Sequence, residues 1–196
     1  MNANGRNWIV FAGSIAVTLA VATGYLATAG GDDDNIRRVL RRTGDAAFII
    51  LLLVFVARPL RQLVATPFTR TMLRYRRLLG IAFAGVHSAH LLFILYRHGQ
   101  GGNFEFLVAE NLPGGLVYLV ILLMFATSFD RTARAIGPRN WRFLHKAGLY
   151  VVFAAFVQAV APRNSDEIVS IYGALTALAA TAVAIRVAAF VKRRQA

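Results

Sequence analysis

The stretch of sequence that decides the fold is RRLLGIAFAGVHSAHLLFILYRH, residues 76–98. Its apolar run, Leu78–Tyr96, is bounded by arginines and is about as long as the roughly 20 residues that take a helix across a bilayer. Backbone amides in hydrocarbon must bond to one another, so a run of this kind is predicted to be an α-helix. It contains His87 and His90, and ionisable groups at membrane depth are costly and usually functional.

Five further runs of the same kind lie on either side of this one. They are Trp8–Ala29, Ala46–Ala65, Leu112–Phe129, Trp141–Ala161 and Ile168–Val191. None alternates apolar and polar residues as the strands of an outer-membrane barrel do. The sequence therefore predicts an all-α fold: a polytopic bundle of six transmembrane helices that forms one integral membrane domain over residues 1–196. We interpret the first run as a retained helix, because its apolar part exceeds the ~7–15 residues of a cleaved signal peptide.

The composition supports a membrane protein and excludes several kinds of chemistry. Hydrophobic residues make up 57% of the chain and charged residues only 16%, whereas soluble domains have about 45–50% and about 25%. There is no cysteine, which excludes disulfides, thiolate nucleophiles, iron–sulfur clusters and cysteine-based zinc sites. The net charge of +13 would suggest nucleic acid as a partner if the protein were soluble.

The positions of the basic residues instead predict the orientation of the chain. If the N-terminus lies inside, sixteen Lys and Arg residues fall in inner segments and six in outer ones, while Asp130 is the single acidic residue inside. Short cytoplasmic loops carry such an excess. We therefore expect both termini to be cytoplasmic and the protein to lie in a bacterial inner membrane. Its positive charge would attract anionic membrane lipid, and no nucleic-acid partner is expected.

Histidines are the residues most suited to chemistry within the predicted spans. His87 and His90 are three residues apart and so share one helix face; either at least one is a ligand, or both join helices as polar contacts. His145, at the start of the fifth span, is either a ligand or an interfacial histidine. Neutral imidazoles on facing membrane helices commonly hold b-type haem among phenylalanine, leucine and small residues.

Several short motifs, taken in order, resemble the ferric-reductase-like transmembrane domain family. The resemblance covers about residues 40–160. Within the family, the chain resembles in particular the branch of haem-binding subunits of periplasmic methionine-sulfoxide reductase systems. The motifs are Thr43-Gly44, Arg58-Pro59-Leu60, Arg76-Arg77-Leu78-Leu79-Gly80 with the helix that ends in His90, Thr127-Ser128, and Gly137 with Arg139, Trp141, Leu144 and His145.

The resemblance implies a b-haem protein that moves electrons, with His90 and His145 at ligand positions. The family's second histidine of the fifth span is Gln158 here. At ~1.5 Å per residue, His90 lies about 21 Å along its helix from Arg76, while His145 lies about 6 Å beyond Trp141, so one iron does not easily take both. Three outcomes stay open: a haem on His90 alone or with His87, a helix tilt that brings His90 and His145 together, or no haem.

Three further polar residues are candidate cofactor contacts. Arg76 and Arg77 either pair with haem propionates or a flavin phosphate, or serve only the inside-positive topology. Gln158 either hydrogen-bonds a quinone carbonyl or joins helices.

The sequence favours an electron-transfer subunit with one b-type haem, and with quinone or FMN as a further cofactor. It would take electrons from a cytoplasmic quinol or flavoprotein and pass them to an outer-side partner protein that holds the substrate-reducing site. No catalytic residue is expected in the chain itself. The alternative is a haem-free membrane scaffold or assembly protein that keeps the fold, and Gln158 is the residue that speaks for it.

Overall fold

The computed structural model describes residues 3–100, 112–162 and 171–195, and this part of the chain is built from helices. The helices are α1 (Ala3–Ala29), α2 (Asp33–Leu63), α3 (Pro67–Gln100), α4 (Leu112–Ala126), α5 (Asp130–Val160) and α7 (Ile171–Gln195). No strand occurs among these residues, so the predicted all-α class is confirmed. The first residues of the sixth predicted span, from Ile168, lie outside the described part.

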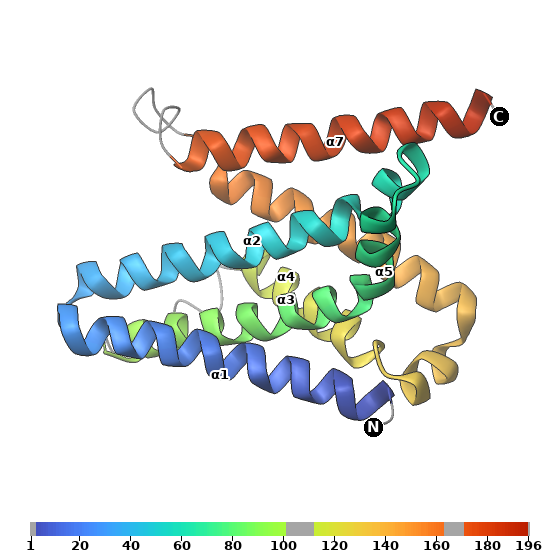
Figure 1. Cartoon of the computed structure of the whole chain (residues 1–196). Helices are drawn as coiled ribbons and strands as arrows, with labels where there is room; N and C mark the ends of the chain where they lie inside the picture. Colours follow the sequence, from blue (N-terminus) through green and yellow to red (C-terminus); the bar gives the residue numbers. More distant parts are fainter. Residues whose placement is uncertain (1–2, 101–111, 163–170, 196) are drawn as a thin grey trace.

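Successive helices run up and down the bundle, and both termini lie at the same end (Figure 1). We call this the terminal end, and the opposite one the far end. Five helices are long and apolar enough to cross a membrane, and α4 has a shorter apolar stretch, Pro113–Ala126. The six predicted apolar runs are thus six helices. Which side of the membrane the termini face stays a prediction.

The helix α2 begins well before the predicted span at Ala46. The Asp32 side chain accepts a hydrogen bond from the backbone N–H of Asn35 at 2.8 Å, and Asp32 is thereby an N-cap. Asp33 then pairs with Arg37 one turn later, and with Arg97 at the end of α3. These polar contacts extend the helix past the apolar segment, which is why a search for apolar runs found only its membrane part.

The fourth and fifth spans also differ in their ends from the prediction. Helix α4 stops at Ala126, before the predicted Phe129, and α5 starts at Asp130. Gly137 interrupts α5 with φ 76° and ψ 161°, a left-handed φ that a residue with a Cβ rarely adopts. Pro138 follows and disfavours helical backbone at the residue before it. The membrane part of α5 therefore begins after this kink, in agreement with the predicted start at Trp141.

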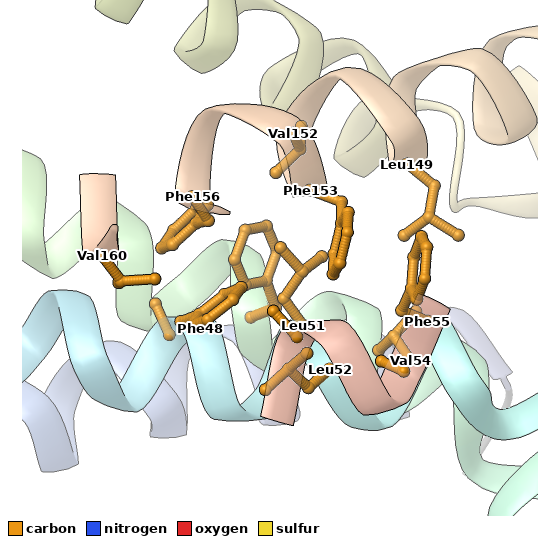
Figure 2. Close-up of a cluster of buried hydrophobic side chains, with 14 of the residues drawn as sticks. Phe48, Leu51, Leu52, Val54, Phe55, Leu149, Val152, Phe153, Phe156 and Val160 are labelled. Carbon is orange, nitrogen blue, oxygen red and sulfur yellow. The ribbon is translucent and has the colours of Figure 1, made fainter. Parts of the chain in front are cut away.

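Stacked phenylalanines of α2 and α5 form the centre of the bundle (Figure 2). The rings of Phe55 and Phe153 are 3.9 Å apart and nearly parallel, and those of Phe48 and Phe156 are 5.5 Å apart. Face-to-face packing of this kind between two helices fixes how α5 is rotated about its axis. It thereby decides which α5 residues face α3 and α4.

Helix α1 packs closely against α3 at one glycine. A Cβ on Gly85 would lie 2.0 Å from Ser14 Oγ and 2.8 Å from the Phe11 carbonyl oxygen, so no side chain fits there. Near the terminal end, the Asn7 side chain donates to the Ser128 carbonyl at 3.2 Å. The first helix thus packs against the bundle through α3 and through the end of α4, and its retention in the protein stays a prediction.

Candidate functional site

A cavity of about 410 Å³ lies between five helices, in the half of the bundle toward the far end. Its volume falls within the ~300–1,000 Å³ typical of cofactor sites. Most of the lining is apolar, and several positions are small. The described lining residues are Leu40, Arg41 and Gly44 of α2; His87, His90 and Ile94 of α3; Gly114, Val117 and Tyr118 of α4; Ala155, Phe156, Ala159 and Val160 of α5; and Tyr172 of α7.

His90 enters this cavity with one ring nitrogen already held. Its Nδ1 lies 2.8 Å from the Thr43 hydroxyl oxygen, and that hydroxyl lies 2.9 Å from the Val39 carbonyl oxygen. The direction of the Thr43–His90 bond depends on the tautomer of His90. In the tautomer with the proton on Nδ1, the Thr43 hydroxyl donates to the Val39 carbonyl and accepts from Nδ1–H. Nε2 then carries the lone pair, the arrangement in which a histidine binds a metal while its other nitrogen is fixed by a neighbour.

Next to Thr43, helix α2 has a glycine facing the edge of the His90 ring. A Cβ on Gly44 would lie 3.7 Å from Cε1 of the His90 ring, so the imidazole rests directly over the α2 backbone. The cavity walls have small residues at four positions, Gly44, Gly114, Ala155 and Ala159. A flat ring system can come close to helices only where side chains are this small.

Two side chains of the cavity wall each hold a buried polar atom that has no hydrogen-bond partner among the described residues. They are Nδ1 of His87 and the hydroxyl of Tyr118. The two rings are stacked 4.5 Å apart, and the ring of His87 also lies 5.2 Å from that of His90. An unpaired buried donor or acceptor costs about 1–3 kcal/mol. Both atoms are covered by packed side chains, so neither faces the open space of the cavity.

The structure separates His145 from this cavity. Its Nε2 lies 3.0 Å from the Thr127 hydroxyl, which in turn lies 2.7 Å from the Leu123 carbonyl oxygen. The ring of Trp141 stacks on His145 at 4.3 Å, and its indole N–H donates to the Thr127 carbonyl. The contact with Thr127 engages Nε2 of His145, and its direction depends on the tautomer. His145 therefore joins α5 to the end of α4, and it does not line the cavity.

Arg76 and Arg77 also lie away from the cavity. Arg76 Nε donates to the Val54 carbonyl at 3.0 Å, while Arg77 bonds the Ser128 carbonyl and forms an ion pair with Asp130 at 2.9 Å. These partners lie toward the terminal end. The two arginines thus surround a different region from the one that His87 and His90 face.

Gln158 is exposed on α5 and does not line the cavity, although its neighbours in sequence, Phe156 and Ala159, do. The structure thus brings together His87 and His90 of the predicted site residues. It places His145 with Arg76 and Arg77 toward the terminal end, and it leaves Gln158 on the surface.

The sequence did not identify three of the cavity residues as site residues. Thr43 had been noted only as part of a motif, while Tyr118 and Arg41 had not been singled out. Arg41 is exposed, yet it lines the cavity and is the only Arg, Lys, Asp or Glu among the described lining residues. The signal available in the sequence was weak, since each is a single polar residue near a helix end or within an apolar run.

The described residues do not form a metal site from protein side chains alone. Among them, no group of three or more His, Cys, Asp or Glu could hold a metal ion. An iron bound at His90 would therefore need most of its ligands from a porphyrin.

Comparison with known proteins gives a consistent set of relatives. A family model described as ferric reductase like transmembrane component matches residues 43–157. The chain is 27% identical over 151 residues to the protein-methionine-sulfoxide reductase heme-binding subunit MsrQ of Polaromonas naphthalenivorans, covering 71% of this chain and 66% of that protein. It is 25% identical over 159 residues to the magnetosome protein MamZ of Paramagnetospirillum magneticum, covering 76% of this chain and 24% of that protein. No solved structure matches the chain.

Proposed function

Because this chain belongs to the family of ferric reductase like transmembrane components, we propose that it is a membrane electron-transfer subunit that holds one b-type haem in the cavity beside His90. The observation that carries the proposal is the Thr43–His90 contact of 2.8 Å beside an apolar cavity. A Thr43 hydroxyl that accepts from Nδ1–H leaves Nε2 of His90 with the lone pair that binds iron. A relative named for haem binding, similar over most of this chain, supports the same cofactor.

The residues of the cavity have distinct roles in this proposal. His90 binds iron, and Thr43 keeps its ring in the tautomer and orientation that binding needs. Gly44 leaves room for the ring edge, and the phenylalanine and alanine side chains of α5 exclude water. Arg41, at the far-end rim, pairs with a haem propionate, since a guanidinium suits a carboxylate. Bound haem supplies a one-electron centre, so no acid–base residue is required.

The proposed direction of electron flow follows from the predicted orientation. With the termini in the cytoplasm, the far end and its cavity face the outer side of a bacterial inner membrane. A quinol or a flavoprotein would donate electrons on the cytoplasmic side, where Arg76 and Arg77 suit a quinone or the phosphate of FMN. The acceptor would be an outer-side partner protein. The name of the MsrQ relative suggests a reductase of methionine sulfoxide as the type of acceptor.

A haem-free membrane scaffold is the second candidate function. The exposed position of Gln158, where a histidine of the family is expected, is the observation that favours it. A chain without a second ligand of this kind would keep the helix packing and lose the iron.

Absorption spectroscopy separates these two functions. The full chain is produced in haem-replete cells and purified in detergent. We expect a Soret band that shifts on reduction, and we expect His90→Ala to remove it. His98→Ala is the matched control, since His98 lies on the same helix and does not line the cavity. A colourless protein from haem-replete cells would favour the scaffold.

A further inference from the structure

Resting on the proposed function, we infer that the haem in this cavity has His90 as its one protein ligand and keeps an open sixth position for a small neutral diatomic molecule. The chain would then be a ligand-binding haem protein as well as an electron carrier. The inference rests on the relative orientation of the His87 and His90 rings and on the apolar side chains of the cavity wall that α5 contributes.

His87 cannot bind the same iron from the opposite face. Axial ligands of one iron point at each other across the porphyrin, so their rings lie end to end. The rings of His87 and His90 instead lie face to face, 5.2 Å apart with planes only 9° from parallel, on the same side of one helix. His87 also stacks on Phe83 at 5.7 Å and on Tyr118 at 4.5 Å, which holds it in this column of rings.

The wall that α5 contributes has no atom that can bind iron. The described residues of α5 that line the cavity are Ala155, Phe156, Ala159 and Val160. His145 lies elsewhere on α5 and is engaged by Thr127, and Gln158 points to the surface. A second ligand from this helix would require it to rotate, which the parallel stacking of Phe55 on Phe153 and of Phe48 on Phe156 opposes.

The chemistry of the α5 wall selects the kind of ligand. A charged ligand would have to lose its hydration against alanine, valine and phenylalanine, which is expensive. A neutral diatomic molecule is weakly hydrated, so it loses little hydration free energy on entering this apolar site. Polarity and access on the free side of a haem decide whether it binds small ligands. Carbon monoxide binds by forming one dative bond from its carbon to ferrous iron, and no bond breaks and no electron leaves.

Carbon monoxide is therefore the probe for the test. The purified full chain, loaded with haem, is reduced with dithionite and titrated with carbon monoxide while its spectrum is recorded. We expect a high-spin ferrous spectrum before addition and a shifted, sharpened Soret band after it, with one carbon monoxide per haem. Resonance Raman or electron paramagnetic resonance of the ferric form should also report high spin.

A gain of ligand provides the second arm of the test. Ala155→His places an imidazole in the α5 wall, and we expect it to convert the haem to low spin and to remove the response to carbon monoxide. Ala154→His is the matched control, because Ala154 is exposed on the neighbouring position of α5 and does not line the cavity. This control should keep the high-spin spectrum and the carbon monoxide response of the natural chain.

The outcomes distinguish this inference from the proposed function. A low-spin spectrum and no response to carbon monoxide in the natural chain would overturn the open position and leave haem binding intact. A chain that binds no haem would instead remove the proposed function itself.

Discussion

Replacing Thr43 with valine should weaken haem binding, because it removes the hydroxyl that accepts from Nδ1–H of His90. In the haem-free protein the ring of His90 is able to turn toward other partners. Once Nε2 binds iron, Nδ1–H must face position 43. The unpaired donor therefore destabilises only the haem-bound form of the variant. The cost of such a donor is about 1–3 kcal/mol, which corresponds to about 5- to 150-fold in the dissociation constant. Loss of the residue that orients a metal ligand typically costs about 10–100-fold.

The structure offers a matched control for this change. Thr127 is buried to the same degree, with 8% of its surface exposed against 7% for Thr43, and its hydroxyl contacts His145 at 3.0 Å. Thr127→Val removes an equivalent hydrogen bond from His145, which is half-buried like His90. Thr43→Ser keeps the hydroxyl and should restore most of the affinity. The assay is a titration of the haem-free full chain in detergent with haemin, followed at the Soret band.

The expected result is weaker binding for Thr43→Val and unchanged binding for Thr127→Val. If Thr127→Val weakened binding while Thr43→Val did not, the iron would sit at His145, and the assignment of the cavity beside His90 would be refuted. Equal losses in both variants, with lower melting temperatures, would point to general destabilisation, and the serine variant would then fail to recover the affinity.

Four other predictions address packing, the α5 surface and orientation. Gly85→Ala should lower the free energy of unfolding by about 1–3 kcal/mol through overpacking, and the melting temperature should fall with it. Gly80→Ala should leave the melting temperature unchanged, because a Cβ at position 80 would meet nothing within 4 Å. Gln158→His should leave the haem spectrum unchanged because position 158 is exposed; a shift to low spin would show that α5 is rotated. Arg186→Gln should destabilise the protein by about 1–3 kcal/mol in thermal unfolding, because Arg186 donates twice, at 3.1 Å, to the Phe55 carbonyl; unchanged unfolding would mean that water replaces these bonds. A single cysteine added at either end of this cysteine-free chain should react with membrane-impermeant reagent only from the cytoplasmic side, and labelling from outside would reverse the orientation.

The contact between Arg186 and Phe55 shows why some polar residues were hard to interpret from the sequence. Pro59 has no N–H, so the Phe55 carbonyl, four residues earlier in α2, has lost its helical donor. Arg186 of α7 supplies the replacement, and its guanidinium also lies 3.9 Å from the centre of the Phe55 ring. The proline is visible in the sequence, but the identity of the residue that compensates for it is not.

The cavity was predicted only in part for a similar reason. The sequence singled out His87 and His90, since ionisable residues in an apolar run are conspicuous. It gave no role to Thr43, which contacts His90 across 47 positions of sequence, or to Tyr118, which reads as one more aromatic residue in an apolar helix. The start of α2 was missed because capping by Asp32 and ion pairing by Asp33 extend the helix through a segment in which charged residues separate the apolar ones.

The sequence by itself determined that the chain is a bundle of membrane helices, and it determined how far along its helix each histidine lies. The rise of a helix per residue is set by backbone geometry, so the ~21 Å between Arg76 and His90 follows from counting. Only the tertiary structure decided that His90 faces an open cavity, that His145 is taken up by Thr127, and that Gln158 faces outward. The rotation of each helix about its axis depends on side-chain packing between helices, such as the stack of Phe55 on Phe153, and that packing joins residues far apart in the chain.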